Sequence, residues 1–419
     1  MKKHLLFVAA VCTALLASAD PNDPQVRLVS ATMDSSRNLN IKYMLDEPAI
    51  VTFDVKTNGV SIGAANLKNA FRDVYRVVPA AGGSRTIILP ATEALPDSIT
   101  RRKRAVTVTV TAWATNSPPD YLVIKLVGED KGARTFYTAP EWLPGEGGVT
   151  NDMYKTDYLV MRRIPAAGKT FRMGSPSTEA YRYSNEILHY VSLTNDYYMT
   201  VFNLTQGQFR NITLNFPGFA ENGIDDTTSI TRWEYKPTFP VEQYACSVMR
   251  GTEKQWPGDG HEVAATSTLA LFRNALGLST LDLPTEAEWE FACRAGTLSA
   301  YYNGTNGSEK IAWTGSSDVP HAVGLLEPNA YGIYDMCGNV FEWCLDRFSE
   351  NHAETGSTVI APVGPESGNG RVVRGCEPRW TNGNGNDRSA YRFRNGSSAQ
   401  GLGMSDTYYY DGYRLVCTF

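Results

Sequence analysis

A change of pattern near residue 128 limits what this chain can fold into. Between residues 25 and 127, short segments such as AIVTFDVKT and AVTVTVTAWA alternate apolar and polar residues, and Gly, Asn, Asp or Pro separate them. A period of two with many β-branched residues is typical of antiparallel strands. We therefore expect an all-β sandwich domain over residues 20–127 and a linker over 128–156. The sequence of the first domain has no residues at the spacing of a catalytic site. We therefore expect this domain to be a binding module, a spacer or a structural support.

The second region, residues 157–419, has brief apolar runs and frequent Gly and Asn. Its clearest helix is TEAEWEFACRA, Thr285 to Ala295, where Thr285 and a glutamate three residues later form a capping-box pattern. Two further helices are expected near residues 267–276 and from about Thr205. The fold class is therefore α+β with much irregular chain, which metal ions or disulfides commonly stabilise.

The N-terminus resembles an export signal. Lys2 and Lys3 precede an apolar run from Leu5 to Leu16, and Ala17-Ser18-Ala19 follows. This order is typical of a cleaved signal peptide, here residues 1–19. A run of about a dozen apolar residues is shorter than the ~20 that a membrane helix needs. We expect a secreted or periplasmic protein without a membrane span, and a membrane anchor is the disfavoured alternative.

Charge and cysteine content narrow the possible partners. The formal net charge of −5 argues against nucleic acid as a partner. Six cysteines follow the predicted signal, and the sequence leaves open whether they form disulfides or remain buried thiols. They are Cys246, Cys293, Cys337, Cys344, Cys376 and Cys417. The histidines at 189, 261, 321 and 352 lack the spacing of a zinc site, so we expect surface or hydrogen-bonded side chains.

Four motifs follow one another in the second region. They are FRMGSPSTEA with HYVSLTNDYYMTVFNLTQGQF, then LDLPTEAEWEFACRAGT, then NAYGIYDMCGNVFEWCLD, and finally RVVRG, RSAYRFRN and GYRLV. Together they resemble the formylglycine-generating-enzyme family, also called the sulfatase-modifying-factor family. The resemblance covers about Asp157 to Phe419. It implies an irregular α+β fold related to C-type lectins, preceded here by the β-sandwich domain.

The same resemblance implies an activity that one segment calls into question. Active members oxidise a sulfatase cysteine to formylglycine with copper and two cysteines, which follow an RGGSW-like segment. The matching text here is RGCEPRWTNGNGNDRSAYRFRN, with no cysteine between Cys376 and Cys417. Thiolates suit Cu(I), so the missing pair argues against copper and leaves Cys376 as the one weak catalytic candidate. The alternative is an oxidase with an unusual thiol arrangement.

A calcium site is expected in DMCGNVFE. The carboxylates of Asp335 and Glu342 flank a turn whose carbonyl oxygens at Gly338 and Val340 would complete the ligand set that Ca²⁺ prefers. The resemblance implies calcium at matching positions. The alternative is that Glu342 pairs with an arginine.

A recognition groove is expected in residues 379–410, which are rich in Asn, Gly, Ser, Arg and Tyr. This composition is typical of recognition loops, although solvated loops share it. The candidate ligand-binding residues are Trp380, Arg388, Tyr391, Arg392 and Arg394. The ligand class, whether protein, peptide or glycan, stays unknown. Our interpretation is an exported, calcium-stabilised, non-catalytic binding module; the alternatives are the copper-dependent oxidase and a structural, envelope-associated protein.

Overall fold

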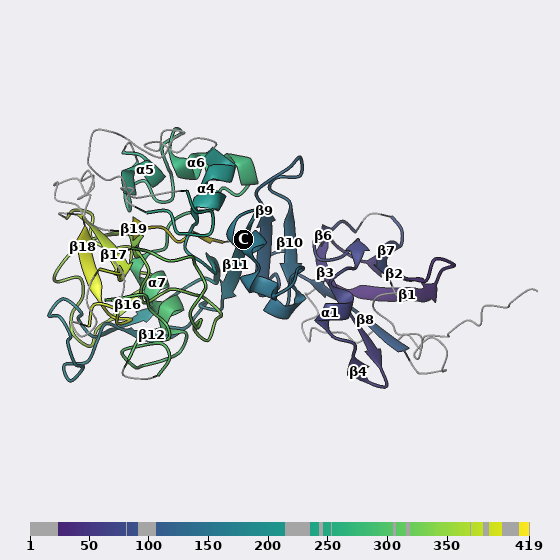
Figure 1. Ribbon diagram of the computed structural model, residues 1–419, viewed down its shortest axis with the longest axis horizontal. Helices are drawn as coiled ribbons and strands as arrows, with labels where there is room; N and C mark the ends of the chain where they lie inside the picture. The colour runs from purple at the N-terminus through teal and green to yellow at the C-terminus, as the bar shows by residue number, and fades with distance from the viewer. Residues whose placement is uncertain are drawn as a thin grey trace, which may run out of the picture. The chain divides into compact units, whose positions relative to one another are not determined.

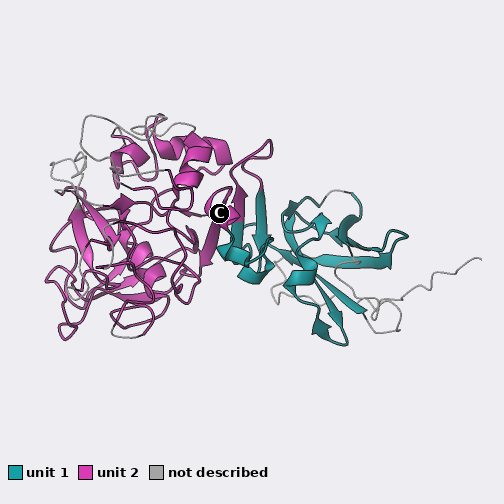
Figure 2. Ribbon diagram, in the orientation of Figure 1, with its two compact units in different colours: residues 1–122, 134–151, 419 teal, residues 123–133, 152–418 magenta. Residues whose placement is uncertain are grey.

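A computed structural model describes most of the chain. The described ranges are 24–80, 82–90, 106–213, 235–242, 246–252, 254–304, 307–315, 319–368, 370–379, 385–395 and 410–418. The predicted signal peptide lies outside them. The chain divides into two compact units, one of residues 1–122, 134–151 and 419, the other of residues 123–133 and 152–418 (Figure 2). Each unit is described by itself.

The first unit consists mainly of strands. They are β1 (Val26–Met33), β2 (Asn38–Leu45), β3 (Ala49–Thr57), β4 (Val60–Ser61), β5 (Phe71–Arg72), β6 (Val77–Val78), β7 (Arg85–Pro90), β8 (Val106–Trp113) and β10 (Arg134–Tyr137), with helix α1 (Ala64–Leu67). One sheet has the order β1-β2-β7-β5; the other has the order β4-β3-β6, and β8 pairs with β3. Every second residue of β8 is buried, as period-two alternation requires. Strands β1 and β2 of one sheet contact β8 of the other.

The segment predicted as a linker, residues 128–156, is more structured than expected. It contains β10 and three short 3-10 helices, η1 (Pro140–Trp142), η2 (Gly148–Thr150) and η3 (Asp152–Lys155). Phe136, Tyr137 and Leu143 are buried in the structure. The Gly and Pro residues of this segment favoured a linker in the sequence analysis, although several residues between them are buried.

The second unit is a mixed α/β structure with many strands and few helices. Its strands are β9 (Tyr121–Lys125), which begins in the first unit, β11 (Tyr158–Ile164), β12 (Thr170–Met173), β13 (His189–Ser192), β14 (Tyr197–Thr200), β15 (Phe341–Arg347), β16 (Thr358–Ile360), β17 (Arg371–Gly375), β18 (Arg392–Asn395), β19 (Asp411–Gly412) and β20 (Val416–Cys417). Its helices are α4 (Gln206–Thr213), α5 (Cys246–Arg250), α6 (Thr268–Leu276) and α7 (Glu286–Arg294). The helices expected at Thr205, residues 267–276 and Thr285 are all present.

Three small sheets organise this unit. Counting only the strands of this unit, their orders are β9-β11-β14-β20, β12-β13-β16 and β18-β17-β15-β19. Helices α4, α5 and α6 form one group, while α7 packs against β12, β15 and β17 (Figure 1). Among the described residues, no helix combines the length and apolar character that a membrane span requires.

The local sequence determines where helix α7 begins, and most of the helix is buried. The capping box is present, since the Thr285 hydroxyl accepts from the backbone N–H of Glu288 and the Glu288 carboxylate accepts from the backbone N–H of Thr285. The helix buries Trp289 completely. It also buries two carboxylates, Glu286 and Glu290, which must find partners inside the protein.

Arginines from the neighbouring strands supply those partners. Arg374 of β17 donates to Glu290 at 2.5 Å and to Glu286 at 3.3 Å. Arg392 of β18 forms two hydrogen bonds of 2.7 Å with Glu286. Arg294 pairs with Glu290 from the last turn of the helix. We call Glu286, Glu290, Arg294, Arg374 and Arg392 the ion network of α7.

Gly174, which follows β12, attaches the preceding strand to this network. Its N–H donates to Glu290, and its carbonyl oxygen accepts from Arg294. Its φ of +86° favours glycine, and a Cβ placed there would lie 2.4 Å from the carbonyl oxygen of Ile187. Only glycine therefore fits both the conformation and the space.

We expect Gly174→Ala to destabilise the protein more than Gly168→Ala does. Gly168 also has a positive φ, of +69°, but a Cβ there would meet nothing within 4 Å. Both changes should cost about 1 kcal/mol for the conformation, and Gly174→Ala a further ~1–3 kcal/mol for the clash. Urea unfolding midpoints measure the difference. Equal midpoints would contradict the steric argument.

Candidate functional site

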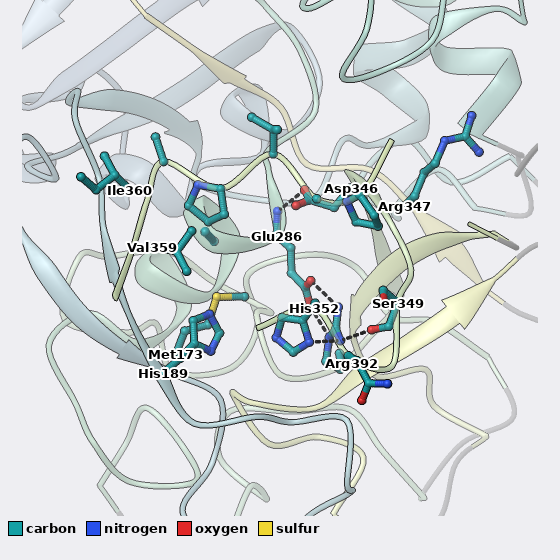
Figure 3. Close-up of a pocket in the computed structure, with 17 residues that line it drawn as sticks. Met173, His189, Glu286, Asp346, Arg347, Ser349, His352, Val359, Ile360 and Arg392 are labelled. Atoms are coloured by element: carbon teal, nitrogen blue, oxygen red, sulfur yellow. Dashed lines mark hydrogen bonds and ion pairs between the residues drawn. The ribbon is translucent and has the colours of Figure 1, made fainter. Parts of the chain in front are cut away.

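A cavity of about 420 Å³ lies beside the N-terminus of α7 (Figure 3). Its walls come from the end of β12, the start of β13, the start of α7, the end of β15 with the loop that follows, the start of β18, and β16 with the proline-rich loop that follows. The volume falls within the range of small-molecule sites. Segments that are distant in sequence therefore meet at this cavity.

The charged groups at the base of the cavity neutralise each other. Glu286 and Arg392 are both buried and form a two-point ion pair. Burial alone would raise the pKa of Glu286, but the charges of Arg392 and Arg374 lower it to about 2. Glu286 is therefore ionised at neutral pH, and its charge is matched within the protein.

Two histidines stand against each other in the cavity wall. The rings of His189 and His352 make an edge-to-face contact with centroids 5.2 Å apart. Burial and the positive charge of Arg392 lower the pKa of His352 to about 4, so its ring is neutral at pH 7. Sequence spacing did not anticipate this pair, because it depends on the parallel pairing of β13 with β16.

Asp346, at the end of β15, carries the site's most perturbed carboxylate. One of its oxygens accepts the backbone N–H of Glu286 at 2.7 Å. Burial raises its pKa, and the nearby negative charge of Glu286 adds to this, giving a value of about 7. Asp346 therefore exchanges a proton near neutral pH, and it was missing from the predicted site.

Arg388 and Tyr391, two of the predicted groove residues, are buried instead. The Arg388 guanidinium donates to Glu179 at 2.6 Å and to both oxygens of Glu186 at 2.5 and 2.7 Å. Tyr391 packs edge-to-face on Tyr183 with centroids 5.3 Å apart. A ligand could reach Arg388 only by displacing its carboxylates. Arg388 as a ligand-binding residue stays a prediction, and local composition does not show which arginines have internal partners.

The other three predicted groove residues have different positions. Arg392 lines the cavity, although its guanidinium is already paired. Arg394 is exposed on β18. Trp380 lies outside the described residues. The structure therefore brings one of the five predicted residues to the cavity.

The Cys376 thiol is enclosed. It is 1% exposed, and its sulfur lies 3.5 Å from the carbonyl oxygen of Glu377. Burial, together with the charges of Asp387 and Glu377, raises the pKa of Cys376 well above its usual range. All six cysteines after the predicted signal are buried free thiols, which is one of the two alternatives left open by the sequence.

Glu342, the predicted calcium ligand, has an arginine partner. Its carboxylate accepts from Arg414 at 2.7 and 2.9 Å, from Asn203 at 2.7 Å and from Trp289 at 2.6 Å. All these groups are buried. Calcium would have to compete with four N–H donors for these two oxygens. The geometry agrees with the alternative in which Glu342 pairs with an arginine.

Asp335 differs from Glu342 in that one oxygen remains available. Its Oδ2 accepts the N–H of Gly324 at 2.7 Å, and its buried Oδ1 has no hydrogen-bond partner within the described chain. Burial raises the pKa of Asp335 to about 6. Over the same described residues, no three His, Cys, Asp or Glu side chains gather in a metal-binding group. Calcium at Asp335, Gly338, Val340 and Glu342 stays a prediction.

Ionised Asp346 should destabilise the fold, with a cost that depends on pH. The folded pKa, about 7, exceeds the ordinary value of 3.8, so the cost is absent below pH 4 and complete above pH 7. A tenfold change in proton affinity is worth about 1.4 kcal/mol. We expect Asp346→Asn to gain ~2–4 kcal/mol relative to wild type between pH 4 and 7.

Urea unfolding at several pH values measures this difference, with exposed Asp152→Asn as the control. A stability difference between Asp346→Asn and wild type that is the same at every pH would contradict the assignment.

Comparisons with known proteins agree with the four motifs. The family model for the sulfatase-modifying factor enzyme 1-like domain matches residues 161–417. The formylglycine-generating enzyme of Thermomonospora curvata is 40% identical over 111 residues, 22% of this chain and 37% of that protein. The serine/threonine-protein kinase pkn1 of Chlamydia pneumoniae is 38% identical over 119 residues, 28% of this chain and 19% of that protein.

Each match thus covers well under two thirds of the relative's length. Among solved structures, PvdO from Pseudomonas aeruginosa is 21% identical with a TM-score of 0.46, covering 62% of this chain and 95% of that one. Variable protein 1 of Treponema denticola is 25% identical with a TM-score of 0.44, covering 62% and 96%. The family model spans more than half of the chain. The chain therefore belongs to the sulfatase-modifying factor enzyme 1-like domain family.

Proposed function

We propose that this protein is an exported, sulfatase-modifying-factor-like module that binds a ligand and does not oxidise sulfatase cysteines. One observation carries the second half of this proposal: Cys376 is enclosed, and its pKa is raised. Copper-dependent oxidation needs thiolates that both hold the metal and meet the substrate thiol. A protonated, buried thiol without a second cysteine in its segment does not fit copper.

The cavity beside α7 supports the binding half of the proposal. It combines an internally neutralised ion pair, two imidazole rings and a carboxyl group that titrates near pH 7. Perturbed groups that converge in a hollow are typical of functional sites. This geometry does not distinguish among a protein, a peptide and a glycan as the molecule that carries the bound group.

Calcium remains part of the proposal, with Asp335 as its main carboxylate ligand in place of an equal pair with Glu342. Asp335 offers a buried oxygen that has no hydrogen-bond partner in the described chain, which suits a hard cation. The carbonyl oxygens of Gly338 and Val340 would be its neighbours in the ligand set. Glu342 would join only by giving up donors such as Arg414. When bound, the ion would stabilise the turn that precedes β15.

Purified protein should neither retain copper nor convert a Cys-x-Pro-x-Arg peptide to its aldehyde. Metal analysis and mass spectrometry of the peptide measure both properties. Cys376→Ala should behave as the wild type does, since the thiol has no catalytic role. Aldehyde formation by wild type that is lost in Cys376→Ala, but kept in the equally buried Cys246→Ala, would overturn the proposal.

Chelation of calcium should lower the melting temperature of wild type, and Asp335→Asn should abolish that response. Glu342→Gln should lower the melting temperature equally with and without calcium, because it leaves Arg414 buried without a counter-charge, a loss of ~3–5 kcal/mol. Differential scanning calorimetry distinguishes the two. A wild type that is insensitive to chelation would remove calcium from the proposal.

A further inference from the structure

We propose that the cavity beside α7 binds a small neutral molecule with an apolar body and a head group that both donates and accepts hydrogen bonds, such as a carboxamide or an alcohol. This inference rests on the proposed binding role and names its ligand class. It follows from three features of the cavity: its charges, the tautomers of its histidines and its apolar wall.

The first feature is that Arg392 has little left to offer a ligand. Its Nε and Nη2 hold Glu286 at 2.7 Å each. Its Nη1 donates to the carbonyl oxygens of Asn185 at 3.3 Å and Ser349 at 2.8 Å, and lies 2.7 Å from Nδ1 of His352. An anionic head group would therefore face the Glu286 carboxylate without gaining the guanidinium.

Arg347, the other arginine of the lining, points its guanidinium away from Glu286 and Arg392 in Figure 3, and its Nη2 donates to the neutral side chain of Gln255 at 2.9 Å. An anion would lose water without finding a prepared counter-charge, which is unfavourable in an enclosed site. A neutral head group loses less. Charge therefore selects against carboxylates and phosphates.

The second feature is that each histidine has its tautomer fixed by its partner. A guanidinium only donates, so Nδ1 of His352 accepts from Arg392 and the proton of the neutral ring sits on Nε2. A carbonyl oxygen only accepts, so Nδ1 of His189 donates to Ile187 at 2.7 Å and Nε2 carries the lone pair. The two rings thus offer one donor and one acceptor.

Asp346, in its ionised form, adds a second acceptor. Its Oδ2 holds the helix N–H, while Oδ1 has no hydrogen bond to any described residue. Within the same described chain, Nε2 of His189 and Nε2 of His352 are likewise without hydrogen bonds. A carboxamide or hydroxyl head group matches a donor and two acceptors, whereas a group that only donates or only accepts does not.

The third feature is an apolar wall on the side of the cavity where His189 lies in Figure 3. Met173, Val359 and Ile360 lie on one side of the cavity in Figure 3, and Asp346, Ser349 and Arg392 lie on the other. Ile360 is 70% exposed and Val363 is 41% exposed, so the apolar surface continues outward. An apolar body would be drawn to it by the hydrophobic effect.

Three probes of similar size separate the head groups: butyramide, butyrate and butylammonium. Binding is followed by NMR on protein labelled at the methionine methyl carbons, with the Met173 signal assigned from Met173→Leu. We expect butyramide to shift the Met173 signal saturably and the two ions to need at least about tenfold more ligand. A stronger response to butyrate or to butylammonium would overturn the inference, as would no response to any probe.

A surface variant tests the apolar wall without endangering the fold. Ile360→Ser removes exposed apolar area and should weaken butyramide binding by about threefold. Leu325→Ser is the matched control, because Leu325 is similarly exposed, at 58%, and does not line the cavity. Equal affinities for the two variants would contradict the predicted contact.

These outcomes are distinct from failure of the proposed function. If no probe shifts the Met173 signal and no aldehyde forms from the sulfatase peptide, the ligand class is wrong while the absence of oxidase activity stands. If aldehyde forms, the proposed function is wrong, whatever the probes do.

Discussion

The ion network of α7 is the interaction on which the second unit depends. Placing Glu286, Glu290, Arg374 and Arg392 inside a protein costs several kcal/mol per ion, and only well-placed opposite charges and hydrogen bonds repay that cost. Arg374 meets the requirement by donating to two carboxylates and to the carbonyl oxygens of Ser389 and Ala390. Since each group needs several partners at once, few positions of the helix relative to β17 and β18 satisfy all of them.

The cavity is a by-product of the same constraint. Glu286 uses its side chain to hold Arg392 and its backbone N–H to hold Asp346, so the first residue of α7 positions two polar groups of the cavity. These two neighbouring carboxylates thereby have pKa values that are shifted in opposite directions. Glu286 has two arginines beside it and its pKa falls, whereas Asp346 is buried beside a negative charge and its pKa rises. Residues that hold α7 in place therefore also line the cavity.

Local features of this fold could be predicted from the sequence, and long-range pairings could not. The capping box of α7, the alternating strands of the first unit and the family motifs all depend on residues within one short window. By contrast, Glu286 and Arg392 are 106 positions apart. The arginine-rich segment resembled a binding surface because composition does not reveal whether a guanidinium has an internal carboxylate. The contact between His189 and His352 was not predicted either, because it also joins residues that are far apart in the sequence.

The motif Asn329 to Glu342 shows why family membership leaves the function open. Asn329 donates to the carbonyl oxygens at the end of α7, at Ala292 and Cys293, and accepts from the backbone of its own loop. Glu342 is held by Arg414. In this chain, the polar side chains of the motif thus satisfy buried partners, which is a structural role that does not depend on what the protein binds. Other cavity-lining groups, such as His352 and Ile360, lie outside the motif, so the motif by itself does not specify what the cavity binds.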